Sequence, residues 1–426
     1  MQADLILRRA NLPNGARGVD MLIADGLIQV VGPQIEAEGR KEIDATDCLV
    51  TAPFVDCHFH MDATLSLGLP RLNRSGTLLE GITLWGELKP LLTADAVIER
   101  AMAYCDMAVA QGIQAIRSHV DICDDRLLGV EALLDVKARV APYLDLQLVA
   151  FPQDGFYRAP KARENLLRAL DLGVEVVGGI PHFERTMDEG RRSVVELCAI
   201  AAERGLMVDM HCDETDDPLS RHIETLAAET LKHGLEGRVA GSHLTSMHSM
   251  DAYYVSKLIP LIAEAEVAAI ANPLVNMVIQ GRHDRYPKRR GLTRIPELMD
   301  AGVVTAFGHD CVMDPWYNLG SGDMLDVAHM AVHAAQMTSR DDLHRCFAAI
   351  TSEPARILGL EGYGVEPGCD ANLVVLDAAD PIEAIRLKAA RLHVVRWGSV
   401  VATAPPRTAR LDLEGRPAEI GFRARR

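Results

Sequence analysis

Residues 52–60, Ala-Pro-Phe-Val-Asp-Cys-His-Phe-His, form a short apolar run that ends in two histidines, His58 and His60. Three later segments share this character, because each is a short apolar run with imidazole or acid side chains at its end. They are residues 205–214, ending in His211-Cys212-Asp213-Glu214, residues 238–243, ending in His243, and residues 303–310, ending in His309-Asp310. Strands of a (β/α)₈ barrel look like this, since functional side chains gather at their C-terminal ends. We therefore predict an α/β fold built on a TIM-like (β/α)₈ barrel.

The spacing of the apolar runs supports the barrel. Between Val55 and Phe307, strand-like segments alternate with longer helical stretches, as in residues 113–117 followed by residues 127–140. About eight such units can be counted, and this alternation favours a parallel sheet.

The two ends of the chain differ from the middle. Residues 5–7, 21–23 and 27–31 are short strand-like pieces, and Asp25-Gly26 is a turn signal between the last two. Residues 371–376 and 394–397 have the same style. We predict a small β-sandwich formed by both termini. The expected division is residues 1–50 for its N-terminal part, 51–360 for the barrel, 361–404 for its C-terminal part and 405–426 for a tail on the surface.

Composition excludes several classes of protein. The 426 residues carry a formal net charge of -16, which argues against binding a nucleic-acid backbone. No apolar run approaches the ~18 residues of a membrane span, and Asp4, Arg8 and Arg9 interrupt any signal-peptide pattern. The nine cysteines include no C-x-x-C pair, so neither a disulfide framework nor a zinc knuckle is indicated. We expect a cytoplasmic protein.

The strand-end histidines indicate a metal site. His58 and His60 alternate along a strand, so both imidazoles point to one face. A lone histidine on an apolar face is more often a hydrogen-bonded core residue than a ligand. Here His211 and His243 follow strands in the same way, and Asp310 follows the last one. Three imidazoles and a carboxylate suit a divalent ion of the zinc or iron type, and we predict a metal-dependent hydrolase.

At this point the chain resembles a known family. It is similar to the amidohydrolase superfamily over nearly its whole length, and most closely to the bacterial cytosine deaminases. The stretches that carry the resemblance are Ser75-Gly76-Thr77-Leu78, Phe151-Pro152-Gln153, His211-Cys212-Asp213-Glu214, Ala271-Asn272-Pro273-Leu274-Val275-Asn276, Tyr286-Pro287-Lys288-Arg289-Arg290-Gly291 and Asp314-Pro315-Trp316-Tyr317.

The resemblance implies a set of metal ligands and a homo-oligomeric enzyme. The ligands would be His58, His60, His211 and Asp310, and the cofactor one divalent ion, Fe²⁺ or Zn²⁺. Many relatives hold two metals bridged by a lysine at the end of the fourth strand. We take that strand to end in residues 151–153, which contain no lysine, so we expect a single ion.

The resemblance also implies roles in catalysis. Glu214 would carry a proton to a ring nitrogen, and His243 would stabilise the attacking hydroxide with help from Asp310. For Glu214 the alternative is an exposed loop acid.

Further residues are expected to hold the substrate. The side chain of Gln153 and backbone groups near Leu78 would bind the ring, and Trp316 would form a wall of the pocket, with simple packing as its alternative. The basic stretch from Arg282 to Arg294 either closes over the ligand or is a solvated loop.

One position departs from the family pattern. Bacterial cytosine deaminases usually carry a second Asp directly after the metal Asp, whereas this chain has Cys311. In the family that position borders C5 of the pyrimidine. Removing a carboxylate opens apolar space, and burying a methyl group there contributes about 0.8 kcal/mol. We therefore interpret Cys311 as a shift in substrate preference toward 5-methylcytosine. The alternative is that the Asp-to-Cys change reflects neutral drift at a position that tolerates substitution.

The sequence therefore predicts hydrolytic deamination of a free cytosine-type base, 5-methylcytosine to thymine or cytosine to uracil, with release of ammonia. Isocytosine, creatinine or a triazine amine are alternative substrates. A non-catalytic assembly protein is disfavoured by the retained ligands. A phosphoester hydrolase would need basic phosphate-binding residues, whereas Gln153 and Glu214 suit a neutral ring. His222-Ile223-Glu224 matches half of another deaminase signature, but no P-C-x-x-C follows; we place it on a helix.

Overall fold

The centre of the molecule is a sheet of eight parallel strands curled into a barrel, seen in the computed structural model, which describes residues 3–423. An isolated parallel bridge between Phe59 and Asp310 links the first and last strand regions. The strands, in order round the barrel, are β6 (Phe54–Phe59), β7 (Ile113–Asp121), β8 (Asp145–Phe151), β9 (Val176–Gly179), β10 (Met207–Cys212), β11 (Val239–His243), β12 (Ala268–Ala271) and β13 (Thr305–Phe307). The predicted (β/α)₈ barrel is confirmed.

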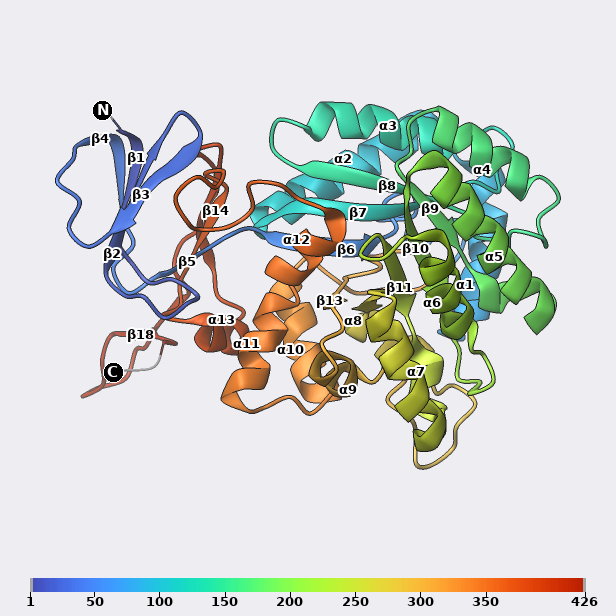
Figure 1. The fold of residues 1–426 in the computed structure, drawn as a ribbon. Helices are drawn as coiled ribbons and strands as arrows, with labels where there is room; N and C mark the ends of the chain where they lie inside the picture. Colours follow the sequence, from blue (N-terminus) through green and yellow to red (C-terminus); the bar gives the residue numbers. More distant parts are fainter. Residues whose placement is uncertain (1–2, 424–426) are drawn as a thin grey trace.

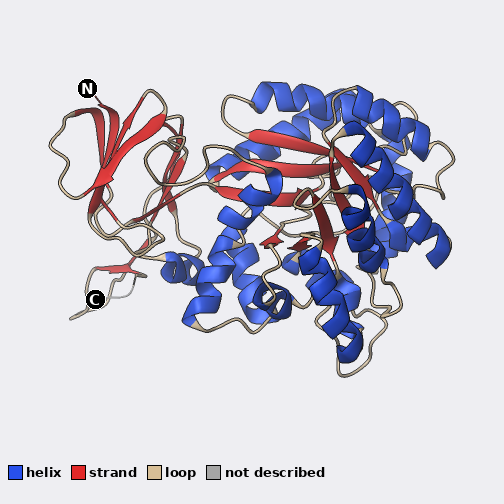
Figure 2. Cartoon of the chain, viewed as in Figure 1, coloured by secondary structure: helices blue, strands red, loops and turns tan. Residues whose placement is uncertain are grey.

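Helices surround the strands on the outside of the barrel (Figure 2). They are α1 (Leu78–Leu88), α2 (Ala94–Ala110), α3 (Leu128–Val140), α4 (Ala162–Asp171), α5 (Met187–Arg204), α6 (His222–His233), α7 (Ala252–Glu264), α8 (Pro273–Ile279), α9 (Ile295–Asp300), α10 (Met324–Ala334), α11 (Arg340–Ala348) and α12 (Ser352–Leu358), with 3₁₀ turns η1 (Lys89–Leu91), η2 (Pro181–Phe183) and η3 (Thr245–Ser249). Local signals set their ends: the Thr93 side chain accepts a hydrogen bond from the Ala96 amide at the start of α2, and left-handed Gly205 ends α5.

A second, smaller unit contains strands from both ends of the chain, drawn blue and red side by side in Figure 1. One sheet has the order β3-β2-β1-β4 and the other β16-β15-β14-β5. Their strands are β1 (Ala3–Ala10), β2 (Val19–Ala24), β3 (Leu27–Gly32), β4 (Gly39–Asp44), β5 (Leu49–Thr51), β14 (Leu373–Leu376), β15 (Arg391–Arg396) and β16 (Ser399–Thr403). Leu5, Ile23 and Val375 meet in the core between the sheets. The predicted sandwich from both termini is therefore present.

The remaining C-terminal elements are short. Helix α13 (Pro381–Leu387) lies between β14 and β15, and strands β17 (Thr408–Arg410) and β18 (Glu419–Gly421) pair as a largely exposed antiparallel ribbon. Among the described residues, no helix is long and apolar enough to span a bilayer. All nine cysteines are unpaired thiols.

One expectation about strand order was wrong. Phe151-Pro152-Gln153 follows β8, which is the third barrel strand and not the fourth. The segment between β6 and β7 contributes only α1, η1 and α2, and no strand of the barrel. The fourth strand is β9, and it is followed by Ile180-Pro181-His182. The absence of a lysine at the end of the fourth strand holds for this corrected position.

Candidate active site

The strand-end residues converge because the backbone turns sharply where each strand stops. Asp213, His243 and Asp310 have φ values of 55°, 72° and 71°, in the left-handed region that non-glycine residues rarely occupy. Such conformations persist only where the surrounding structure enforces them, and they gather at functional sites. The side chains that follow β10, β11 and β13 are therefore presented from a backbone that the fold holds under constraint.

The four predicted ligands meet in the barrel mouth. His60 Nε2 lies 2.9 Å from His211 Nε2, and Asp310 Oδ1 lies 3.5 Å from His58 Nε2 and 3.4 Å from His60 Nε2. Ligand atoms arranged tetrahedrally at ~2.0–2.1 Å from an ion are about 3.4 Å apart. His58 Nε2 is buried and has no hydrogen-bond partner among residues 3–423. These donors fit a divalent metal ion.

Burial also gives the imidazoles the protonation state that a ligand requires. Desolvation lowers the pKa of His58, His60 and His211 well below the ordinary range. Neutral imidazoles offer a free lone pair, which is the form that binds a metal.

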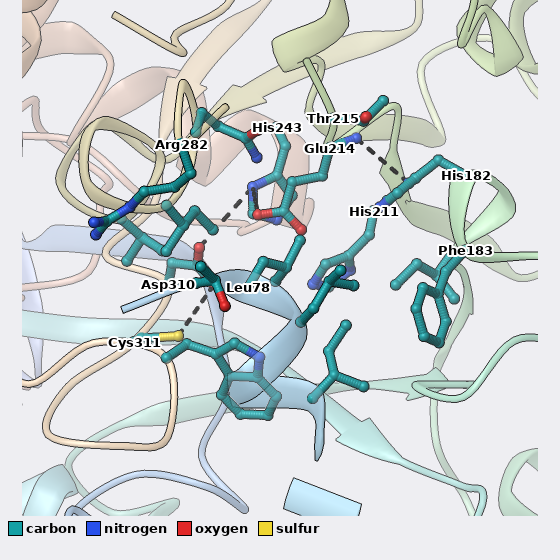
Figure 3. A pocket seen from close by; sticks show the side chains of 18 of the residues that line it. Leu78, His182, Phe183, His211, Glu214, Thr215, His243, Arg282, Asp310 and Cys311 are labelled. Carbon is teal, nitrogen blue, oxygen red and sulfur yellow. Dashed lines mark hydrogen bonds and ion pairs between the residues drawn. The ribbon is translucent and has the colours of Figure 1, made fainter. Parts of the chain in front are cut away.

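An acid and a further histidine lie beside this cluster. His243 Nδ1 is 3.2 Å from Glu214 Oε1 and 4.0 Å from Asp310 Oδ2, and Figure 3 shows the three side chains turned toward one another. Burial, followed by the charge of Asp310, raises the pKa of Glu214 well above its usual value. Burial lowers the pKa of His243 to about 3. These shifts favour the protonated carboxyl form of Glu214 and the neutral form of His243.

Three residues that support this pair were not predicted from the sequence to have a role. Asn276 Nδ2 lies 3.0 Å from His243 Nδ1, and Asn272 Nδ2 lies 3.3 Å from the same ring. The available signal was the i, i+4 spacing of two asparagines directly after a barrel strand. His182, which follows β9, accepts a hydrogen bond from the Glu214 amide at 3.4 Å.

A cavity of about 340 Å³ opens beside the cluster. Its lining includes all four residues expected to contact the substrate, namely Leu78, Gln153, Cys311 and Trp316. Ligand sites of ≈ 300–1,000 Å³ are usual for small molecules, so this cavity suits one small ring system.

Trp316 forms a wall of this cavity because a glycine makes room for it. Its ring centroid is 6.1 Å from that of His60 and 6.0 Å from that of Trp85. A Cβ at Gly81 of α1 would come within 2.3 Å of Trp316 Cδ1. A side chain at position 81 would therefore force the indole or α1 to shift.

Cys311 is a buried, protonated thiol. Its Sγ lies 3.6 Å from Asp310 Oδ1, and burial together with the neighbouring carboxylates raises the pKa of the thiol well above its usual value. A reactive thiolate at this position is therefore disfavoured.

The basic stretch from Arg282 to Arg294 lies partly at the cavity and partly away from it. Arg282 lines the cavity, whereas Arg289 pairs with Asp284 at 2.6 Å and Arg294 donates to backbone carbonyls. The basic stretch thus reaches the ligand space only at its start. His222 lies at the start of α6, as expected for the H-x-E match.

Residues 41–404 match the sequence model of the amidohydrolase family. The chain belongs to that family. The structure is similar to 5-methylcytosine deaminase from Klebsiella pneumoniae liganded with 5-fluorocytosine, with a TM-score of 0.93 and 40% identity, over 95% of this chain and 99% of the other.

Two relatives are similar in sequence. N-isopropylammelide isopropyl amidohydrolase of a Pseudomonas strain is 28% identical, and the match covers 93% of this chain and 97% of the relative. Pterin deaminase of Rhizobium rhizogenes is 29% identical, and the match covers 93% of this chain and 91% of the relative. The family similarity therefore extends over both the barrel and the small unit.

We predict that His211→Ala abolishes stoichiometric metal binding, because it removes one of two imidazole nitrogens that lie 2.9 Å apart. Metal analysis of the purified protein should show one ion per chain in the parent. His222→Asn is the matched control, since this histidine lies on α6 outside the cluster, and it should retain the metal. Two ions per chain in the parent, or full occupancy in His211→Ala, would contradict the assignment.

Proposed function

We propose that this chain is a hydrolytic deaminase of a free cytosine-type pyrimidine, with one Fe²⁺ or Zn²⁺ ion held by His58, His60, His211 and Asp310, and that it prefers 5-methylcytosine. The observation that carries the proposal is a buried Glu214 carboxyl group 3.2 Å from His243, beside the predicted ligands in a cavity of about 340 Å³. The similar Klebsiella enzyme is liganded with 5-fluorocytosine, which supports the class of substrate.

The reaction adds water to the ring carbon that bears the amine and releases ammonia. His58, His60, His211 and Asp310 would hold the ion, which when bound would lower the pKa of water from 15.7 to roughly 7 and so make hydroxide available at neutral pH. The corrected fourth strand ends without a lysine, which supports a single ion.

The side chains of this site manage the protons. Burial raises the pKa of Glu214 and so favours its protonated form, from which it can donate a proton to the ring nitrogen next to the carbon under attack. His243 Nδ1 lies 3.2 Å from Glu214 Oε1, and Asp310 Oδ2 lies 4.0 Å from His243 Nδ1. Either group can accept the proton released by the water and pass it to the amine. Ammonia leaves after the exocyclic amine has been protonated.

The ring is held by groups that match its own donors and acceptors. The Gln153 amide, which is buried at the cavity wall, can pair with the ring carbonyl and N–H. Leu78 is the first residue of α1, so its backbone N–H has no partner within the helix and is free to bind the substrate.

Ammonia release from a panel of bases tests the proposal. Purified, metal-loaded protein should release ammonia from cytosine and 5-methylcytosine, and far less from isocytosine, creatinine or triazine amines. Mass spectrometry of the products should show uracil and thymine. Activity confined to a triazine amine, or no ammonia from any pyrimidine, would overturn the proposal.

Glu214→Gln should reduce kcat on the order of 10²–10⁴-fold, because the amide cannot carry the proton. Metal content should be unchanged, since Glu214 is not one of the proposed ligands. Glu224→Gln on α6 is the matched control and should keep the parent rate. A Glu214→Gln enzyme within threefold of the parent would remove this residue from the mechanism.

Cys311 should set the preference at C5. If the thiol leaves room for the methyl group, kcat/KM for 5-methylcytosine should exceed that for cytosine by roughly 10–200-fold, the range expected for one methyl contact. Cys311→Asp places a polar group against the methyl and should shift the ratio toward cytosine, whereas Cys311→Ser, which adds no carboxylate, should shift it less. The ratio is compared within each variant, and an unchanged ratio in Cys311→Asp would show that position 311 does not recognise C5.

A further inference from the structure

A chain of hydrogen bonds crosses the barrel interior beneath the proposed metal ligands. His58 Nδ1 lies 2.9 Å from Ser242 Oγ, and Ser242 Oγ donates to Asp209 Oδ1 at 2.7 Å. Asp209 Oδ2 in turn accepts from Arg117 Nη1 at 3.0 Å. The four side chains come from four strands, β6, β11, β10 and β7, and their residues are no more than 1% exposed.

Strand geometry explains how the chain reaches the ligands. Asp209 and His211 are two residues apart on β10, so both point into the barrel, with Asp209 one layer deeper. Ser242 pairs in register with His211. At the deep end, Arg117 is fixed by Gln147 Oε1 at 2.7 Å and by the Ile357 carbonyl at 3.0 Å.

The hydrogen atoms in this chain can be assigned. The single hydroxyl hydrogen of Ser242 is directed to Asp209, so the Ser242 oxygen must accept the hydrogen bond from His58 Nδ1–H. His58 Nε2 is then left without a hydrogen. That is the atom 3.5 Å from Asp310 Oδ1, without a partner among the described residues.

We propose that Ser242 and Asp209 are positioning residues that hold His58 in the tautomer and ring orientation required for metal binding, with Arg117 neutralising the buried carboxylate. The inference rests on the metal site of the proposed function but not on its substrate. A buried ion pair is weak evidence for stability, whereas a partner that orients a ligating histidine typically changes metal affinity by 10–100-fold.

Zn²⁺ affinity of the metal-free protein tests this inference, measured by competition with a chelator. Ser242→Ala removes the acceptor of His58 Nδ1–H and should weaken Zn²⁺ binding about 10–100-fold. Ser193→Ala is the matched control, because Ser193 is also fully buried and, within residues 3–423, its hydroxyl bonds only to the Gly190 carbonyl, at 2.8 Å. It should bind Zn²⁺ as the parent does. Ser242→Ala within threefold of that control would overturn the proposal.

Asp209→Asn provides a second measurement that does not depend on the folding of Ser242→Ala. It keeps the shape of the side chain but removes the charge, and it should also weaken Zn²⁺ binding. Parent-like affinity in Asp209→Asn would exclude this residue from the role. A parent that binds Zn²⁺ but releases no ammonia would overturn the proposed function alone, whereas a parent that binds no Zn²⁺ would overturn the metal site and this inference together.

Discussion

Three imidazoles forced together in a dry interior are the constraint on which the site depends. With His60 Nε2 and His211 Nε2 2.9 Å apart, the two facing atoms cannot both carry a hydrogen, and burial disfavours the charged form of either ring. The surroundings hold the rings in place regardless. Phe151 stacks on His211 with ring centroids 4.1 Å apart. Asp213 and His243, at the ends of β10 and β11, have left-handed backbone conformations. A shared cation is the partner that these neutral rings are arranged to receive.

The barrel separates the proposed chemistry from substrate recognition. The proposed metal ligands lie on or directly after strands β6, β10 and β13, whose backbones are fixed by parallel hydrogen bonding. The residues expected to contact the substrate, such as Gln153 and Trp316, lie beyond the strand ends in connecting segments. Loops on a rigid scaffold tolerate change better than the scaffold does. Specificity can therefore differ between relatives that keep one metal-binding arrangement.

Much of the fold and of the candidate site could be predicted from the sequence, because apolar runs ending in histidine indicate both the barrel strands and the side chains at their ends. The contacts of Asn276 and Ser242 could not, since neither residue type in its own segment indicates which ring it will meet across the barrel. The error in the strand number of Gln153 has a similar origin. Whether a segment adds a strand to the sheet depends on hydrogen bonding with distant segments, which the local pattern does not contain.

Position 311 is linked to the cavity wall as well as to the metal ligand. The Cys311 thiol donates to Asp310 Oδ1 at 3.6 Å, and it lies near the buried Asp314, whose pKa burial raises to about 7. Asp314 also accepts the backbone N–H of Trp316 at 2.9 Å. A carboxylate in place of the thiol would add charge to a space that already holds Asp310 and Asp314. The added charge would lie beside Asp314, the residue that accepts the Trp316 amide N–H. In the proposed role of Cys311, recognition at C5 is electrostatic as well as steric, because a neutral thiol adds no charge beside the methyl space or the Trp316 wall.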